Sequence, residues 1–217
     1  MIPVVIPAKP LDVALQRLSG VLDKPERRAL QAAMLSDVLS AATAFSDRVV
    51  IVTADALVAA LAREHGALVA PDSDPPAGIN AAVARGIAAV GARGVLVVMG
   101  DLPCATADDL RQVSVSHPGG RGVVCAVSRD GTGTNAMLLR PPGVIATAFG
   151  VDSLTRHVEA AETAGVESTL VTAPGLMLDV DTPDDLAALV RHPAETRAGL
   201  LCHALGVADR IAAAVQQ

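Results

Sequence analysis

Three aspartates are spaced in a way that suits the binding of a divalent cation. Asp179 and Asp181 lie on either side of one valine in the run L-D-V-D-T-P-D-D-L, and Asp101 comes just after the most apolar stretch of the chain. Alternate residues of an extended segment point to the same face, so the two late carboxylates can converge on one hard cation if Asp101 lies opposite them. This pattern predicts a magnesium site.

Two of these aspartates also have a simpler interpretation. Asp101 follows an apolar strand, at the point where the strands of open α/β sheets present ligand-binding groups, but it could instead cap a helix near Ala107. Asp181, taken alone, could serve only as a partner for the turn that follows it. The presence of the D-x-D pair together with Asp101 favours the metal site.

Positive charge follows the first expected strand. Lys9 stands in the run P-A-K-P, and Arg17 comes later in the same loop. A lysine and an arginine at this place can neutralise a triphosphate, and arginine can bind it through two parallel hydrogen bonds. The alternative is that both are solvated loop charges. Asn80, at the start of an expected helix, either contacts the base or ribose of a nucleotide or only caps that helix.

Two glycine-containing turns are suited to an anion. In the turn at residues 129–135, R-D-G-T-G-T-N, backbone amides can approach an anion closely and threonine hydroxyls can donate to it. A plain hairpin turn is the alternative, because G-x-G matches neither the P-loop nor the dinucleotide fingerprint. In the run F-G-V-D-S, Gly150 precedes an expected helix start, where free amides favour an anion. Asp152 or Ser153 could instead be only a cap.

Length and composition indicate one domain. The chain has 217 residues, 51% of them hydrophobic, which is enough for one core, and nothing marks a linker between two cores. We therefore expect a single domain over residues 1–217, with a helical extension from about residue 194. The longest apolar stretches are far shorter than the roughly 20 residues of a membrane span, and no charged leader precedes the first apolar run, so we expect a soluble cytoplasmic protein.

Charge and residue types exclude several other classes. A net charge of -6 argues against a nonspecific nucleic-acid or membrane-surface binder. With two phenylalanines and no tyrosine or tryptophan, the chain has almost no rings to stack on bases, so backbone and amide groups would have to hold a nucleotide base. Neither the cysteines nor the histidines have the spacing of a disulfide framework or a zinc site, and we expect free thiols and no histidine chemistry. These residues are Cys104, Cys125, Cys202, His65, His117, His157, His192 and His203.

The first half of the chain alternates between strand and helix patterns. Such alternation predicts a mostly parallel central sheet with helices on both faces, joined by right-handed crossovers, and a ligand beyond the carboxyl ends of the strands. The expected strands are 2–6, 48–53, 67–70 and 94–99, and the expected helices are 25–42, 55–65 and 78–90.

The second half changes rhythm, and we expect at least one antiparallel pair of strands there. Thr182 can cap a helix with Pro183 at its first position and acidic residues in its first turn. Residues 195–215 carry apolar residues at helical spacing, and this stripe should pack on the body or on a second subunit. The other expected strands are 121–127, 135–139, 169–171 and 176–180, and the other expected helix is 152–164.

Six motifs in order resemble the phospholactate or phosphoenolpyruvate guanylyltransferases of coenzyme F-420 biosynthesis. They cover nearly everything up to residue 190, and six in order are more specific than any one alone. They are P-A-K-P-L-(x)5-R-L at 7–18, A-M-L-S-D-V-L at 33–39, G-I-N-A-A at 78–82, G-D-L-P at 100–103, G-T-G-T-N at 131–135 and L-D-V-D-T-P-D-D-L at 178–186.

The resemblance implies a GT-A-like nucleotidyltransferase that joins GMP from GTP to the phosphate of a small phosphorylated acid and releases pyrophosphate. The acid is phosphoenolpyruvate, which we favour narrowly, or 2-phospho-L-lactate or 3-phosphoglycerate. By position, Asp101, Asp179 and Asp181 would hold Mg2+, Thr134, Gly150 and Ser153 would bind the acid, and Lys9, Arg17 and Asn80 would serve the nucleotide. Catalysis would rest on charge neutralisation and in-line positioning, with Asp101, Lys9 and Arg17 as the catalytic residues.

Two departures from the family pattern stand out. Leu15 and Gln16 replace a lysine-serine pair that usually precedes the arginine of the first loop, and the helix after Pro193 is longer than the usual ending, which suggests a homodimer contact. Other readings keep the carboxylates but change the acceptor, such as a transferase for the molybdenum cofactor or a GT-A sugar transferase. A nucleotide-sensing module would bind GTP without releasing pyrophosphate.

Overall fold

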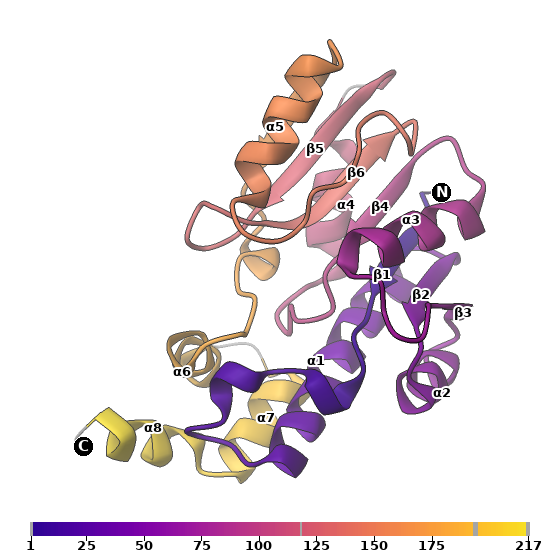
Figure 1. The fold of residues 1–217 in the computed structure, drawn as a ribbon. Helices are drawn as coiled ribbons and strands as arrows, with labels where there is room; N and C mark the ends of the chain where they lie inside the picture. The colour runs from indigo at the N-terminus through magenta and orange to yellow at the C-terminus, as the bar shows by residue number, and fades with distance from the viewer. Residues whose placement is uncertain (1, 118, 193–194, 216–217) are drawn as a thin grey trace.

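The computed structural model describes residues 2–117, 119–192 and 195–215, and within them one mixed sheet has seven strands in the order β3-β2-β1-β4-β6-β5-β7 (Figure 1). β1, β2, β3 and β4 run parallel, β6 is antiparallel to both of its neighbours, and β7 is parallel to β5. The strands are β1 (Val4–Pro7), β2 (Val49–Thr53), β3 (Leu68–Pro71), β4 (Val95–Val98), β5 (Gly122–Val127), β6 (Thr134–Arg140) and β7 (Glu167–Val171).

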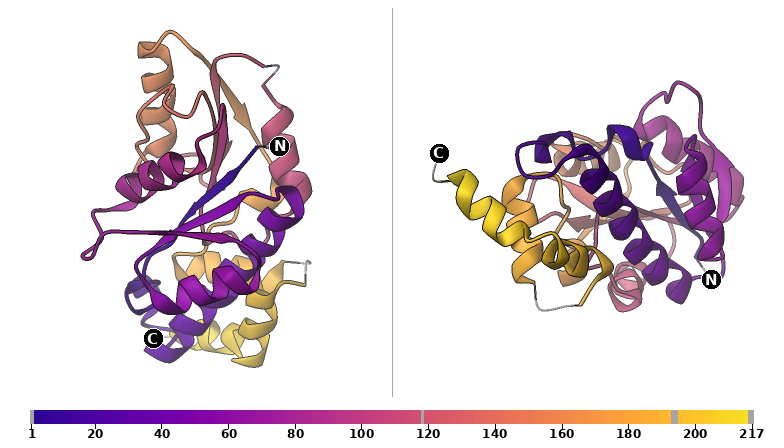
Figure 2. Two further views of the ribbon diagram at one scale, coloured as in Figure 1. Left: turned by 90° about the vertical axis from the view of Figure 1, so that its right-hand side faces the viewer. Right: turned by 90° about the horizontal axis from the view of Figure 1, so that it is seen from below.

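Helices cover both faces of this sheet (Figure 2). α1, α2 and α4 pack on one face, and α3 and α5 pack on the other. The α-helices are α1 (Lys24–Phe45), α2 (Ala56–Glu64), α3 (Ile79–Val90), α4 (Ala107–Val115), α5 (Ser153–Thr163), α6 (Pro183–Arg191), α7 (Arg197–Ala204) and α8 (Val207–Val215), and the 3-10 helices are η1 (Leu11–Val13), η2 (Gln16–Leu18) and η3 (Pro174–Leu176). No helix in the described part of the chain is long and apolar enough to cross a membrane.

The three-layer arrangement and the mostly parallel sheet predicted from the sequence are confirmed. β1, β2 and β4 are almost wholly apolar and buried on both faces, as strands between two helix layers must be, whereas the edge strand β3 is partly exposed. Close packing of α3 on the sheet depends on Gly86, because a Cβ there would lie 2.3 Å from Cγ1 of Val5. The expected antiparallel pairing is also confirmed, since β5 and β6 form a hairpin with a bulge between Ala126 and Val127.

Local sequence signals fix several helix starts. Asp23 and Glu26 form a reciprocal capping box at α1, and Thr182 and Asp185 form another at α6, where Pro183 is the first helical residue as predicted. Thr106 caps α4 in the same way. Asp101 therefore does not cap that helix, and the simpler interpretation of this residue was wrong.

A second, smaller hydrophobic cluster lies below the sheet, and we call it the second core. It joins the loop before α1, the aspartate run and the C-terminal helices. Its buried members are Ala14, Leu15, Leu18, Leu22, Leu30, Met34, Cys104, Leu178, Val180, Leu186, Leu189, Ala198, Cys202 and Val207. The second core thus ties together the loop that carries Arg17 and the loop that carries Asp181.

Two predicted elements were wrong in form. Residues 176–180 are not a strand, because η3 and an irregular segment replace it, although their side chains still alternate between buried and partly exposed. The C-terminal segment is two helices, since Gly206 adopts a positive φ of 63° between α7 and α8. Its apolar stripe packs on the body of the same chain, where α7 lies against α1.

Candidate active site

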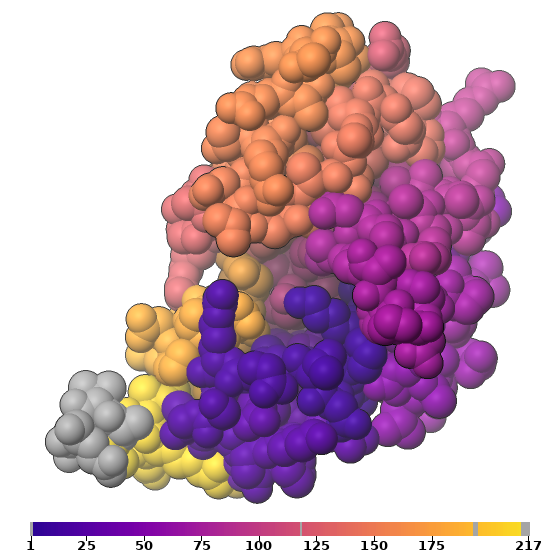
Figure 3. Space-filling model, in the orientation of Figure 1, coloured from indigo at the N-terminus to yellow at the C-terminus, as the bar shows by residue number. Residues whose placement is uncertain are grey.

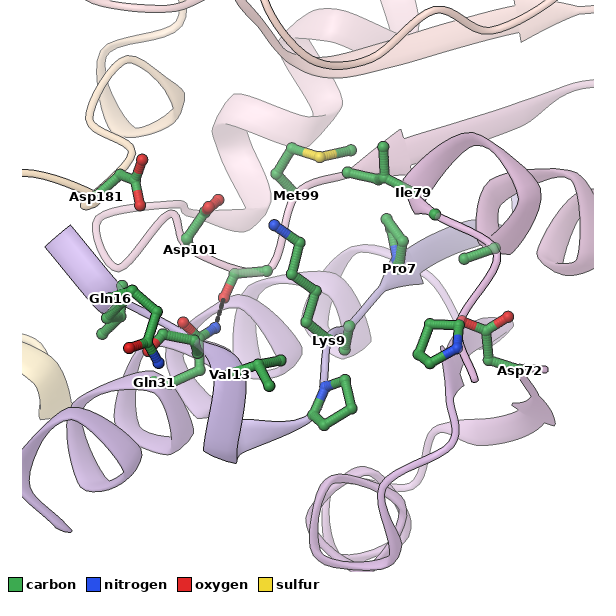
Figure 4. Close-up of a pocket in the computed structure, with 18 of the residues that line it drawn as sticks. Pro7, Lys9, Val13, Gln16, Gln31, Asp72, Ile79, Met99, Asp101 and Asp181 are labelled. Atoms are coloured by element: carbon green, nitrogen blue, oxygen red, sulfur yellow. Dashed lines mark hydrogen bonds between the residues drawn. The ribbon is translucent and has the colours of Figure 1, made fainter. Parts of the chain in front are cut away.

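A cavity of about 480 Å³ opens beyond the carboxyl ends of β1 and β4. The chain runs outward from β1 in both directions along the sheet, so this is the topological switch point at which open α/β sheets bind ligands. Figure 3 shows the hollow between the indigo N-terminal segment and the magenta region around α3. Asp101, Asp181, Lys9, Arg17 and the start of α3 line it (Figure 4). A cavity therefore lies at the edge of the sheet where the sequence predicts a ligand.

Asp101 stands at the mouth of β4 with an unpartnered oxygen. Its Oδ1 is buried and has no hydrogen-bond partner among the described residues. Burial raises the pKa of this carboxyl to about 7, and the nearby Asp179 and Asp181 carboxylates add to the shift. The backbone carbonyl of Asp101 accepts from the N–H of Val180 at 3.1 Å, which holds the aspartate run against the end of β4. Buried oxygens without a partner are rare, and this one suits a cation.

Leu178 and Val180, which alternate with the two aspartates, are buried in the second core. Asp179 and Asp181 therefore point away from it. Burial raises the pKa of Asp179, whose Oδ1 accepts a hydrogen bond from Asn135 Nδ2 at 3.1 Å. The same Asn135 amide donates to the carbonyl of Leu176 at 2.8 Å. The predicted alternation of side chains thus occurs without a strand, because side chains on one face are buried in a core.

Asp101, Asp179 and Asp181 lie close enough that, beyond the effect of burial, the two late carboxylates raise the pKa of Asp101. No group of three histidine, cysteine, aspartate or glutamate residues in the described ranges is close enough to hold a metal as it stands. Oδ1 of Asp101 has no hydrogen-bond partner among the described residues that a metal would have to displace. Oδ2 of Asp181, in contrast, lies 2.7 Å from Arg17 Nη1. An all-oxygen donor set with one orphaned buried oxygen fits Mg2+, provided that Asp181 exchanges its arginine for the metal.

The basic residues Lys9 and Arg17 line the same cavity as Asp101 and Asp181. Lys9 is exposed, makes no hydrogen bond or ion pair with the residues that the structure describes, and extends its amine toward Asp101 and Met99 (Figure 4). Arg17 lies in η2, with 71% of its side chain exposed. Leu15 is buried in the second core with a left-handed φ of 54°. That conformation turns the loop so that Arg17 faces the aspartates.

Asn80 lies beside the cavity but faces a loop. Its Oδ1 accepts from the N–H of Phe149 at 2.8 Å, and its Nδ2 donates to the carbonyl of Phe149 at 3.1 Å. The cap of α3 is Gly78, without a side-chain bond, so Asn80 does not cap that helix. A contact between Asn80 and a nucleotide would have to use the second hydrogen or the second lone pair of the amide.

The three residues predicted for the acid lie together, at a separate place from the cavity lining. The N–H of Thr134 donates to Ser153 Oγ at 2.9 Å, and the N–H of Ser153 donates to the carbonyl of Gly150 at 3.1 Å. The side chains of Thr134 and Ser153 are buried, whereas Gly150 is exposed with a φ of 124°. Asp152 caps α5 without a side-chain bond. Ser153 is therefore the first helical residue and not the cap, and its hydroxyl accepts the N–H of Thr134.

The glycine-rich turn at 129–135 already contains an anion of its own. Oδ1 of Asp130 accepts from Ser128 Oγ at 2.5 Å and from the N–H of Thr132 at 3.0 Å. These hydrogen bonds lower the pKa of Asp130 to about 2, and the bond from the Ser128 hydroxyl has the largest effect. Residues 129–133 are therefore a hairpin turn whose donors are already used by Asp130, which agrees with the plain-turn alternative. Only Thr134, after this turn, is still a candidate for binding an anion.

Two residues of the site escaped the sequence analysis. Asn135 was placed at the end of the glycine-rich turn and at the start of a strand, but its side-chain amide was given no role, although an amide beside a candidate site was a usable signal. His157 was assigned no chemistry, yet it is fully buried and bonded on both ring nitrogens. Its only sequence signal is its position one helical turn after Ser153.

Solved structures with the same fold belong to transferases of activated nucleotides. A crystal structure from Desulfovibrio desulfuricans, described as a candidate nucleotide-diphospho-sugar transferase, matches with a TM-score of 0.74 at 16% identity, covering 95% of this chain and 96% of the other. A nucleotidyl transferase from Methanothermobacter matches with a TM-score of 0.62 at 16% identity, covering 87% and 95%. Glucosyl-3-phosphoglycerate synthase from Mycobacterium tuberculosis, solved with Mn2+ and uridine-diphosphate-glucose, matches with a TM-score of 0.58 at 14% identity, covering 80% and 69%. The fold is therefore GT-A-like.

Sequence relatives narrow the class. The family model "Guanylyl transferase CofC like" matches residues 2–213. Phosphoenolpyruvate guanylyltransferase from Conexibacter woesei is 40% identical over 95% of both chains, and the enzyme of that name from Nocardia farcinica is 39% identical over 95% of this chain and 92% of the other. With the fold, these matches define the chain as a nucleotidyltransferase. It belongs to the CofC-like guanylyltransferase family, as the motif resemblance predicted.

Proposed function

We propose that this enzyme transfers GMP from GTP to the phosphate of phosphoenolpyruvate and releases pyrophosphate, as a step in coenzyme F-420 biosynthesis. Asp101 carries the chemical part of this proposal, because its Oδ1 is buried without a partner among the described residues and its side chain lines a cavity of nucleotide size together with Asp181, Lys9 and Arg17. The choice of GTP and phosphoenolpyruvate is supported by the names of relatives at 34 to 40% identity.

Asp101, Asp179 and Asp181 are the residues that would hold Mg2+. When bound, the ion supplies charge neutralisation at the phosphates and a template for the attacking and leaving oxygens. Glucosyl-3-phosphoglycerate synthase, which has a similar fold, has been solved with Mn2+ and uridine-diphosphate-glucose and with Mg2+ and uridine-diphosphate, which supports the use of a divalent cation.

The protein's own part of the reaction is positioning and charge compensation. Attack by a phosphate oxygen of the acid on the α-phosphorus of GTP brings anions together, and Lys9 and Arg17 are the cations placed to offset that charge. The proton balance is simple, because the acceptor phosphate is already ionised at neutral pH and pyrophosphate leaves as an anion. No protein nucleophile is required.

The acid is assigned to the region of Thr134, Gly150 and Ser153. Since the Thr134 and Ser153 side chains are buried and bonded within the protein, exposed backbone groups around Gly150 would make the direct contacts. Gly150 with its positive φ can present its amide to a carboxylate or phosphate in a way that other residues rarely allow.

The test is pyrophosphate release with magnesium, measured for GTP, ATP, CTP and UTP, each paired with phosphoenolpyruvate, 2-phospho-L-lactate or 3-phosphoglycerate. Mass analysis of the nucleotide product identifies what was joined. We expect a signal selective for GTP and phosphoenolpyruvate. A signal with another acid would change the acceptor, and GTP binding without any pyrophosphate would replace the transferase with a nucleotide-sensing module.

A further inference from the structure

A buried histidine holds the chain just before Gly150. Nε2 of His157, on α5, lies 2.9 Å from the backbone nitrogen of Ala148, and Nδ1 lies 3.1 Å from Oγ1 of Thr134. A backbone N–H can only donate, so Nε2 accepts, and the proton of the neutral ring lies on Nδ1 and is donated to Thr134. The ring has no solvent exposure and packs edge-on against Phe149. His157 therefore ties β6 to residues 148–153, which we call the acid loop.

Asn80 holds the next residue of the same loop. Its amide makes both a donor and an acceptor bond with the backbone of Phe149, at 3.1 and 2.8 Å. Asn80 lies in the first turn of α3, and its neighbours Gly78 and Ile79 line the cavity assigned to the nucleotide. This amide is thus a direct link between the cavity wall and the acid loop.

The acid loop itself has a backbone that needs such support. Gly150 has a φ of 124°, and Asp152 has a left-handed φ of 52°, which a residue with a side chain adopts only at a cost. At the far end, the N–H of Thr134 donates to Ser153 Oγ. The loop is therefore held by side chains at Ala148, Phe149 and Ser153, and the exposed Gly150 lies between these anchors.

We propose that His157 and Asn80 are positioning residues that fix the acid loop in the conformation that binds the phosphorylated acid. This inference rests on the proposed function. His157 accepts from the backbone N–H of Ala148 and Asn80 from that of Phe149, so each residue holds one backbone amide, and neither is among the residues that line the cavity. Because Asn80 directly follows Gly78 and Ile79, which line the cavity, ordering of the nucleotide site and ordering of the acid loop are linked through the first turn of α3.

Each residue can be tested on the amide that it holds. His157→Phe keeps a ring beside Phe149 but loses both hydrogen bonds, and His157→Gln keeps a donor and an acceptor. Hydrogen exchange followed by NMR should show the Ala148 amide exchanging at least about tenfold faster in His157→Phe, and the Phe149 amide doing so in Asn80→Ala. His157→Gln should restore part of the protection.

Steady-state kinetics supply the second measurement. Loss of one or two anchoring hydrogen bonds should raise the KM for phosphoenolpyruvate by about tenfold in His157→Phe and Asn80→Ala. The KM for GTP should change less than that for the acid in His157→Phe. A purely structural role would instead reduce the active fraction and leave both KM values unchanged. The matched control is His117→Gln, because His117 is also buried but neither ring nitrogen has a hydrogen-bond partner among the described residues.

The outcomes separate this inference from the proposed function. Amide exchange at Ala148 and Phe149 as slow as in the wild type would overturn the positioning roles, whatever the activity. Faster exchange with an unchanged KM for the acid would also overturn them. A folded wild-type protein that joins GMP to none of the acids would instead remove the proposed function, and the acid-binding purpose of the loop with it, while the exchange data would still decide whether the two side chains order the loop.

Discussion

Arg17 Nη1 lies 2.7 Å from Asp181 Oδ2, so a residue predicted for the triphosphate and a residue predicted for the metal form an ion pair with each other. Their side chains are 71% and 46% exposed, and such ion pairs contribute about 1 kcal/mol or less. The pair is therefore easily exchanged. Binding of a cation at Asp181 would release Arg17 toward the phosphates that arrive with it.

Replacing Arg17 should affect metal and nucleotide in opposite directions. In Arg17→Gln, Asp181 loses its competitor, so Mg2+ or Mn2+ without nucleotide should bind up to about fivefold more tightly in calorimetry. Turnover with GTP should fall about 10- to 100-fold, because a cation at the phosphates is lost. Arg28→Gln is a matched control, since Arg28 forms a similar exposed pair with Asp12 at 2.9 Å. Weaker metal binding in Arg17→Gln would contradict the exchange.

Removing the charge of Asp101 should stabilise the metal-free protein. The pKa of Asp101 is raised from 3.8 to about 7, chiefly by burial, so the folded state holds a proton between these values that the unfolded state has lost. The stabilisation is full below pH 3.8 and is lost as the pH rises through 7. Asp101→Asn should therefore unfold later than the wild type at pH 8 without magnesium, by on the order of 2 kcal/mol.

Magnesium should reverse that order. Addition of Mg2+ with GTP should raise the unfolding temperature of the wild type and leave that of Asp101→Asn nearly unchanged, because the variant lacks a ligand for the ion. Asp184→Asn, an exposed carboxylate in the first turn of α6, serves as the control. Equal stabilisation of both proteins by magnesium would remove Asp101 from the metal site.

His157 should make the fold sensitive to acid. Burial lowers the pKa of His157 from 6.5 to about 4, and the nearby Arg156 adds to the shift. Between these values the unfolded state binds a proton that the folded state does not, so stability is full above pH 6.5 and declines as the pH falls toward 4. At pH 4 the free energy of unfolding should be lower by about 3 kcal/mol than at pH 6.5.

Denaturant unfolding of the wild type and His157→Gln at several pH values measures this effect as a difference. The difference is needed because the slope from Asp101 has the opposite sign in the same range. The difference in the free energy of unfolding between the wild type and His157→Gln should become smaller as the pH falls from 6.5 to 4. The variant His203→Gln, at an exposed histidine, should show no such change. A gap independent of pH would mean that the ring is not kept neutral.

Asp37 should be needed to hold the C-terminal helices on the body. Its carboxylate, 8% exposed, accepts from the backbone N–H groups of Arg197 and Ala198, each at 3.0 Å. Asp37→Asn should lower the free energy of unfolding by on the order of 2 kcal/mol, because a buried acceptor of two N–H bonds loses its charge. Asp12→Asn, in an exposed ion pair, should cost far less. Urea unfolding of the two variants makes the comparison.

The same variant should also weaken nucleotide binding. α7 contributes Ala198 and Cys202 to the second core, which also contains Leu15 and Leu18 on either side of Arg17. Loosening α7 should therefore raise the KM for GTP more than the KM for the acid. An unchanged KM for GTP in a destabilised Asp37→Asn would show that the loop does not depend on the C-terminal helices.

Much of the fold followed from local pattern. Apolar runs of four to six residues gave β1, β2, β4 and β5, because strands buried on both faces contain little else. Proline and acidic residues at helix starts gave α1 and α6, because the free amides of a first turn select them. The strand predicted at 176–180 was wrong, because the alternating burial of these residues comes from packing on the second core and not from pairing with another strand.

For the candidate site, the sequence by itself determined which residue types gather at the carboxyl edge of the sheet. The order of strands brings Lys9 and Asp101 to one edge, and the alternation in L-D-V-D turns two carboxylates the same way. The tertiary structure alone decided the partners: Arg17 with Asp181, Asn80 with Phe149, and His157 with Ala148 and Thr134. These contacts join residues whose proximity depends on how loops and helices pack in three dimensions, and no local periodicity encodes that distance.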